Sequence, residues 1–343
     1  MGTRTEWLHH RRRPVRLALV AAFALPFALT VAACSGRSSV HVGLPVRPAA
    51  TTARATTTTT GATTTTTAPL PAPSSIAPVA QPALSGEGQW QPAGDRLPGG
   101  WAIYATQLRP AVGDPPVGVA WIDSAATTVA LYAGTTEPHG SWSHQGEVAP
   151  TQQPTLLAAF NAGFRVYAYD TGWYADGRTA LPLQSGKASF VIFANGTATV
   201  ADWGRDVQLG PTVIAVRQNL GLLVDAGAPV ATVSSPGLWG AVFGGGVLTW
   251  RSGIGVTAAG DLVYVAGPEL APASLARLLV TAGAVRAMEL DINHEWVSFA
   301  TFTHPGGLGN GPPMGTNLIP GMYYTPNHYV APYSRDFFAV WAR

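Results

Sequence analysis

The chain has 343 residues, of which 47% are hydrophobic and only 11% are charged, whereas average soluble domains carry roughly 25% charged residues. The formal net charge is +2, but from residue 86 onward 12 basic residues stand against 17 acidic ones. This balance excludes the strongly basic surface on which nucleic-acid binding depends. The single cysteine, Cys34, excludes disulfide bonds within the chain and cysteine-based zinc sites. We therefore expect no nucleic-acid partner, no metal and no cofactor.

The first 33 residues are typical of an export signal. Four arginines between positions 11 and 16 precede an apolar run over 17–31, and small residues follow directly before Cys34. The run is shorter than the ~20 apolar residues that a spanning helix needs, which favours a cleaved signal peptide. The pattern resembles a bacterial lipobox, and that resemblance implies cleavage before Cys34 and a lipid on its sulfur. We expect an exported protein, lipid-anchored to the outer face of the bacterial cell membrane; plain secretion and an uncleaved anchor are the alternatives.

Residues 34–88 are predicted to form a disordered tether. The stretch 51–67 contains 12 threonines, and the stretch 68–83 is rich in proline and alanine. Such a composition buries too little apolar surface to offset the entropy lost on ordering. From residue 89 to residue 343 the pattern becomes globular and predicts one β-rich domain.

Two β-hairpins are predicted in this domain. An Asn-Gly pair at 195–196 separates apolar runs at 189–193 and 197–200, and this pair accepts the positive φ angles of a tight hairpin turn. A second hairpin is predicted between 254–257 and 262–265, which a short glycine-containing turn connects.

The clearest helix begins at Pro272, because proline is well placed in the first helical turn. Apolar residues then recur at i, i+3, i+4 and i+7 up to Ala282, and Gly283 provides a natural end. A strand over 284–292 follows. This strand–helix–strand order is typical of a crossover unit, so we predict an α+β fold with a mixed, β-rich sheet and few helices.

The last of these strands carries the most informative polar residues. Its even positions over 288–292 are apolar and are expected to pack on the helix, whereas Glu289 and Asp291 lie on the opposite face. His294 and Glu295 follow at the end of the strand. A polar face that carries two carboxylates makes this strand a candidate functional site; a solvated face on an edge strand is the alternative.

Four segments in chain order resemble motifs of the phosphodiester glycosidase family. They are AAFNAGF at 158–164, VRQNL-G-LLVDAG at 216–227, WRSGIGV at 250–256 and the helix with its following strand at 271–291. The match spans roughly residues 158–302, over half of the globular part, and the chain resembles a divergent bacterial lipoprotein member of that family. The resemblance implies hydrolysis of a sugar-1-phosphodiester at its glycosidic C–O bond, with a carbohydrate or glycan-phosphate of the cell envelope as substrate.

The resemblance also implies roles for individual residues. Asp291 matches the aspartate of the family's LDGGGS motif and is expected to be the catalytic carboxylate. Arg251 matches the arginine of its RTA motif, and a planar guanidinium suits phosphate. Asn161 matches the asparagine of its NGGF motif and is expected to position the sugar. Gly163 is expected to leave backbone room for a close approach.

Other candidates are less closely matched. Gln218 and Asn219 are possible substrate-binding residues in the second motif. Where the family has a glycine run, Asp291 is instead followed by INHEW at 292–296. In this stretch His294 is a candidate acid or base, and Glu295, like Glu289, is a candidate second catalytic carboxylate.

Trp296 is expected to stack on a sugar or to pack in the core. Because the glycine run is replaced, a non-catalytic carbohydrate-binding or envelope-assembly lipoprotein on the same fold is the alternative to a hydrolase.

Overall fold

The computed structural model describes residues 69–169, 171–240 and 245–343. The signal peptide, Cys34 and the threonine-rich stretch predicted in the sequence lie outside these residues. No helix within the described ranges has both the length and the hydropathy that crossing a membrane would require.

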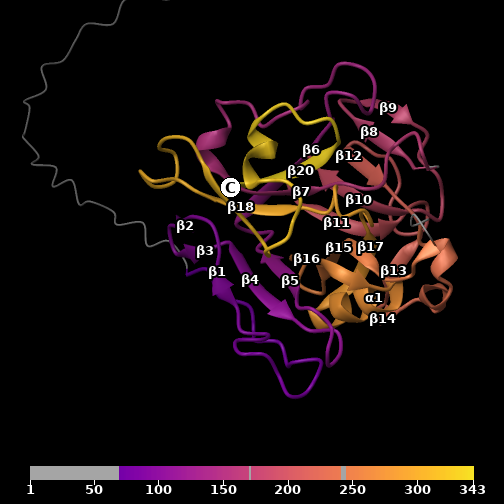
Figure 1. Ribbon diagram of the computed structural model, residues 1–343. Coiled ribbons are helices and arrows are strands. Elements are labelled where there is room, and N and C mark those ends of the chain that lie inside the picture. Colours follow the sequence, from indigo (N-terminus) through magenta and orange to yellow (C-terminus); the bar gives the residue numbers. More distant parts are fainter. Residues whose placement is uncertain (1–68, 170, 241–244) are drawn as a thin grey trace, which may run out of the picture. The chain divides into compact units, whose positions relative to one another are not determined.

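Three sheets make up most of the described structure (Figure 1). The eight-stranded sheet has the order β1 (Gln91–Pro92), β4 (Ile103–Leu108), β5 (Val117–Ile122), β16 (Leu262–Leu270), β15 (Thr249–Thr257), β17 (Ala284–Glu289), β13 (Leu222–Asp225), β14 (Ala228–Pro229). One five-stranded sheet has the order β11 (Ala198–Asp202), β10 (Ala188–Phe193), β12 (Val213–Gln218), β8 (Trp173–Ala175), β9 (Arg178–Leu181). The other has the order β19 (Met314–Asn317), β18 (Phe299–Thr303), β7 (Leu156–Asn161), β20 (Phe337–Ala342), β6 (Thr127–Tyr132).

Smaller elements complete the described part. A two-stranded sheet pairs β2 (Arg96–Leu97) with β3 (Gly100–Trp101), and α1 (Pro272–Thr281) is its one α-helix. The 3-10 helices are η1 (Gln153–Thr155), η2 (Ala231–Ser234), η3 (Pro236–Leu238) and η5 (Pro326–Val330).

The predicted α+β class with a mixed sheet is wrong. The described chain is mostly β-sheet with one ten-residue helix, and every ladder between its named strands is antiparallel. The helix does connect two strands that run in the same direction, β16 and β17. Strand β15 lies between them and pairs with both, so the crossover creates no parallel ladder.

The two predicted hairpins and the helix are confirmed. Strands β10 and β11 flank the Asn-Gly turn, where Gly196 has a φ of +80°, and β15 and β16 form the second hairpin. The predicted apolar stripe of α1 is buried from Leu275 to Ala282. Gly283 follows with a φ of +99°, a left-handed conformation that glycine adopts without a steric penalty.

The face of β17 that contacts the helix is the opposite of the predicted one. Ala287 packs with Leu275 and Leu279 on the helix side of the large sheet, whereas Met288 and Leu290 enter the core between the sheets. The helix side accepts small residues because α1 lies directly on it, and the larger side chains fill the wider space between the sheets. The same alternation sends Glu289 toward the helix side.

Residues 69–88, which composition assigned to the tether, pack against the large sheet. The backbone N–H of Ile76 donates to the carbonyl of Gly88 at 2.9 Å, and the indole N–H of Trp90 donates to the carbonyl of Ser74 at 2.9 Å. Ile76 is buried beside Tyr104 and other side chains of that face. Packing contacts therefore include residues upstream of the boundary predicted at residue 89.

Candidate functional site

Asn161 joins two of the sheets through its side-chain amide. It ends β7, and its Nδ2 donates to Ser252 Oγ on β15 at 3.0 Å and to the carbonyl of Ala162 at 2.8 Å. Its Oδ1 accepts from the hydroxyl of Tyr264 at 2.8 Å and from the backbone N–H of Ser298 at 3.1 Å. Both donors and both lone pairs of this buried amide are therefore used within the protein, so the Asn161 side chain is fixed and holds these segments together.

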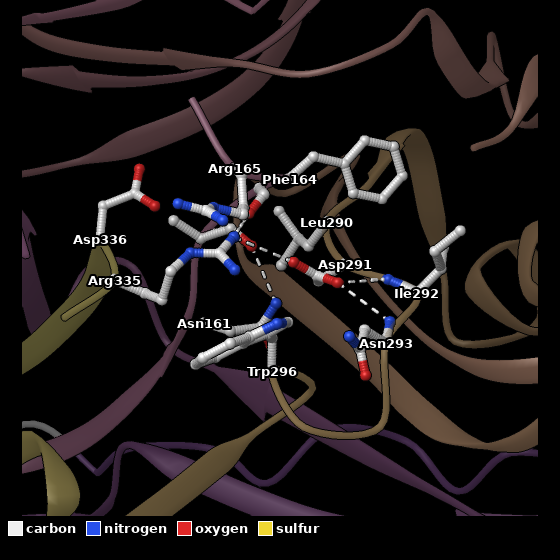
Figure 2. Close-up of polar contacts among 12 residues, drawn as sticks. Asn161, Phe164, Arg165, Leu290, Asp291, Ile292, Asn293, Trp296, Arg335 and Asp336 are labelled. Carbon is white, nitrogen blue, oxygen red and sulfur yellow. Dashed lines mark hydrogen bonds and ion pairs between the residues drawn. The ribbon is translucent and has the colours of Figure 1, made fainter. Parts of the chain in front are cut away.

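Asp291 lies two residues beyond β17, directly beside this junction. Its backbone N–H donates to Ser252 Oγ at 3.1 Å, and its Oδ1 accepts from the backbone N–H groups of Ile292 and Asn293 at 2.8 and 3.0 Å (Figure 2). Its Oδ2 lies 3.3 Å from Nη2 of Arg335. The residue is 4% exposed. Burial raises the pKa of Asp291 from 3.8 to about 6, and the Arg335 guanidinium opposes that rise.

Arg335, which sequence reasoning missed, is the cation of this site. It precedes β20 by two residues, and its Nη2 also donates to the carbonyl of Gly163 at 3.2 Å, while its Nε lies 3.2 Å from Oε1 of Glu137. The guanidinium lies over the indole of Trp296 (Figure 2). Its Cζ is 4.7 Å from the ring centroid. Arg335 is 5% exposed, and its Nη1 has no hydrogen-bond partner among the described residues.

A second buried arginine contacts residues next to Gly163 and Arg335 in sequence. Arg217 on β12 donates from Nε to Oδ2 of Asp336 at 2.5 Å and from Nη2 to the carbonyl of Phe164. Gly163 passes over this guanidinium, because a Cβ at that position would lie 3.2 Å from Arg217 Cζ. Gly163 thus leaves room for the close approach of an arginine of the chain itself, and its predicted role toward a substrate stays a prediction.

Arg251 and Glu289 form a separate ion pair on the helix side of the large sheet. Arg251 Nη1 lies 2.6 Å from Oε1 of Glu289, and both side chains are at most 1% exposed. Among the described residues, Arg251 also donates to the backbone carbonyls of Leu270, Trp239 and Val247. Burial raises the pKa of Glu289 and the guanidinium opposes that rise. The neighbouring Ser252 points to the opposite face, so strand alternation separates Arg251 from the Asn161–Asp291 junction.

Gln218 and Asn219 are buried and hold neighbouring segments together. Gln218 exchanges hydrogen bonds with the backbone of Gln184 and donates to Ser189 Oγ at 3.0 Å. Asn219 Nδ2 donates at 2.8 Å to the carbonyls of Glu289 and Leu290, which fixes the end of β17 just before Asp291.

The residues after Asp291 form its outer rim. His294 is exposed, stacks on Trp250 with ring centroids 4.6 Å apart, and contacts the carbonyl of Gly321 at 2.6 Å. Glu295 is half-buried, and its backbone N–H donates to Oδ1 of Asn293 at 3.0 Å. Trp296 packs under Arg335. The structure thus gathers Asn161, Asp291 and Trp296 around Arg335.

No group of three or more His, Cys, Asp or Glu side chains in the described part of the chain is placed to hold a metal ion. The cluster does offer a carboxylate, a guanidinium with an unused N–H and an aromatic face. A signal for Arg335 existed in the sequence, because an Arg-Asp pair directly precedes the apolar run FFAVWA in a chain that is sparing with charge.

Comparison with known proteins yields only distant likeness of fold. No protein-family model and no curated protein sequence matches the chain. Among solved structures, a zebrafish N-acetylglucosamine-1-phosphodiester alpha-N-acetylglucosaminidase catalytic domain, auto-inhibited by its pro-peptide, is 14% identical with a TM-score of 0.46, covering 74% of this chain and 88% of that one.

Two further structures are also 14% identical. A hypothetical protein from Synechocystis has a TM-score of 0.38, covering 71% of this chain and 62% of its own. A putative exported protein from Burkholderia pseudomallei has a TM-score of 0.35, covering 66% and 74%.

Proposed function

We propose that this protein is an exported hydrolase that cleaves the glycosidic C–O bond of a sugar-1-phosphodiester in an envelope glycan. The resemblance of four segments, in order, to motifs of the phosphodiester glycosidases supports the reaction class. One observation carries the assignment to a site: Asp291, which ends the last motif, pairs with an arginine whose Nη1 has no partner among the described residues. A buried N–H of this kind is costly unless a partner satisfies it, and a phosphate oxygen is such a partner.

The chemistry follows from the two charges. Asp291, ionised above a pKa of about 6, faces the anomeric carbon, where it stabilises or attacks the developing oxocarbenium ion. The bond between that carbon and the bridging oxygen breaks, and the phosphate leaves with the electron pair as a monoester. Water supplies the hydroxyl of the released sugar, and the remaining proton of that water goes to the phosphate monoester or to solvent. Phosphate is a good leaving group, so Arg335 need only hold its charge.

In this proposal Arg335 takes the phosphate role that the family resemblance implied for Arg251. The structure favours the exchange because the Arg251 guanidinium is already bound to Glu289 and to three backbone carbonyls. Trp296 packs against one face of the Arg335 guanidinium and thereby fixes its plane.

The test is release of free sugar from the methyl phosphodiesters of glucose, mannose and N-acetylglucosamine 1-phosphate. In water labelled with oxygen-18, cleavage at carbon places the label in the sugar, whereas attack at phosphorus places it in the phosphate. We expect label in the sugar for at least one compound, with turnover lost in Asp291→Asn. The matched control is Asn293→Asp, which alters the exposed residue beside Asp291 and keeps its backbone N–H.

Label in the phosphate would overturn the proposed reaction. Binding of these compounds without any turnover would instead assign the protein to the alternative class, a non-catalytic carbohydrate-binding or envelope-assembly lipoprotein. One contact favours that alternative, because Oδ1 of Asp291 is held by the backbone of its own loop.

We further propose that Cys34 carries a lipid that anchors the protein to the outer face of the cell membrane. The motivation is its place after a basic and then apolar N-terminal stretch. Cys34→Ala should abolish labelling by a radioactive fatty acid and move the protein out of the membrane fraction. Membrane retention unchanged in Cys34→Ala would favour an uncleaved anchor.

A further inference from the structure

Two hollows lie on either side of His144, along strand β6 at the edge of its five-stranded sheet. The first has a volume of about 310 Å³ and lies between β6 and the β8–β12 part of the other five-stranded sheet. The second has a volume of about 380 Å³ and extends toward Trp341. Both are lined by Ala130 and His144, so they adjoin each other, and we call the two hollows together the β6 groove.

The first hollow is walled by aromatic rings. Trp142 and Trp173 meet edge to face with centroids 4.3 Å apart, and Tyr174 lies next to them in the lining. Arg178 stacks on Trp142 with its Cζ 4.1 Å from the ring centroid, which fixes the indole. The indole N–H groups of both tryptophans are buried without a hydrogen-bond partner among the described residues, and an oxygen acceptor from a ligand would satisfy them.

Polar groups are placed at the rim and in the second hollow. Asp176 lines the first hollow, and its Oδ2 accepts from the backbone N–H of Ser143 at 2.7 Å. Burial lowers the pKa of His144, so its imidazole is neutral at neutral pH and is both a donor and an acceptor. The second hollow adds three threonine hydroxyls and the amide of Gln152.

This lining selects for a neutral, hydroxyl-rich ligand with an apolar face. Aromatic walls with a few convergent polar groups are typical of small-molecule sites. The Asp176 carboxylate would repel a phosphate-bearing ligand, because both groups are negatively charged. A purely apolar ligand would leave the indole N–H groups unpaired, and a cation would meet Arg178, which already occupies one face of Trp142.

We propose that the β6 groove is a carbohydrate-binding site for a neutral oligosaccharide, separate from the proposed catalytic site. A pyranose ring would stack on Trp142 in the first hollow, and the next sugar units would reach the hydroxyl-lined second hollow. None of the groove residues is among the described partners of Asp291 or Arg335. The site would hold the protein on a glycan chain, whether or not Asp291 is catalytic.

The experiment is isothermal titration of the full chain with chitotetraose, maltotetraose, cellotetraose and mannotetraose. We expect at least one of them to bind. Trp142→Ala should weaken that binding roughly tenfold, since losing an aromatic contact of this kind costs about 1 kcal/mol or more. Asp176→Asn should weaken it roughly threefold. Asparagine retains an acceptor for Ser143 and tolerates the φ of +53° at this position, so this variant tests the charge without disturbing the turn.

The matched control is Trp90→Ala, which removes a half-buried tryptophan directly before β1 that lines neither hollow of the groove. It should leave sugar affinity unchanged. Hydrolysis of the methyl phosphodiesters should also be unchanged in Trp142→Ala and Asp176→Asn, which separates this proposal from the proposed function. The proposal is overturned if none of the four sugars binds, or if binding survives both groove substitutions within twofold. A proline-rich peptide that binds in place of the sugars would reassign the groove to peptides and overturn it equally.

Discussion

Two buried arginine–carboxylate pairs flank the end of β17, and they differ in how completely the protein satisfies them. On the helix side, each guanidinium nitrogen of Arg251 donates a hydrogen bond, to Glu289 or to one of three backbone carbonyls. On the loop side, Arg335 holds Asp291 but keeps an Nη1 without a partner among the described residues.

The comparison distinguishes the two arginines by how far the protein already uses their guanidinium nitrogens. Every guanidinium nitrogen of Arg251 already has a partner in the protein, so Arg251 has less to offer a substrate than Arg335, and its removal leaves a buried charge behind. An arginine with an unused N–H beside a carboxylate of raised pKa has the properties expected of a binding or catalytic group. We therefore expect the Arg251–Glu289 pair to determine stability and the Arg335–Asp291 pair to determine activity.

The largest expected effect breaks the helix-side pair. Arg251→Met should lower the free energy of unfolding by about 3–5 kcal/mol, because Glu289 is left buried without its cation. Denaturant unfolding measures the change, and turnover per folded molecule should be retained. In the double variant with Glu289→Leu, much of the loss should be recovered. Equal losses in the single and double variants would show that packing, not charge, makes Arg251 important.

Asp291→Asn should affect turnover instead of stability. Removing the charge while keeping the shape is expected to lower kcat by ~100-fold or more, as for other lost transition-state contacts. Binding of the same phosphodiester should be retained, and the melting temperature should change less than in Arg251→Met. If turnover persists in Asp291→Asn, the roles of the two pairs are not divided as we infer.

Arg335→Lys tests the planar grip with the charge retained. Lysine has one nitrogen in place of the guanidinium fork, so it would lose either the contact with Gly163 or the one with phosphate. We expect kcat/KM to fall ~10-fold. The parallel change Arg251→Lys should lower the melting temperature and leave kcat/KM of the folded protein unchanged. A reversed outcome would return the phosphate role to Arg251.

The smallest expected effect is on pH dependence. Because the pKa of Asp291 is raised to about 6, kcat should rise as pH increases through about 6. Arg335→Gln removes the cation that lowers this pKa, so the rise should move to higher pH.

The stability of the protein should change in the opposite direction. An acid whose folded pKa is raised stabilises the protein below its ordinary pKa of 3.8, and that contribution is lost as pH rises toward 6. Relative to Asp291→Asn, the free energy of unfolding of the wild type should therefore fall over this range. A parallel pH dependence in the two proteins would show that Asp291 does not titrate there.

Several features of the molecule were determined locally and were therefore predictable. The Asn-Gly turn, the spacing of apolar residues in α1 and the glycine after it depend on φ angles and on periodicity within a few residues. Asp291 and Asn161 were also identified from sequence, and the structure brings them to one junction through Ser252. The functional roles of both residues remain proposals.

What only the tertiary structure decided is which distant groups meet and which face of a strand each group occupies. Arg335 reaches Asp291 across 44 positions of sequence, and no periodicity links the two. Alternation along β17 predicted two faces, but only the packing of α1 on the Ala287 side determined which face meets the helix. The tertiary structure likewise decided the strand order, in which β15 lies between β16 and β17. Local propensities determine turns and elements, whereas the burial of charge and the pairing of sheets are settled by contacts that form only when the whole chain packs.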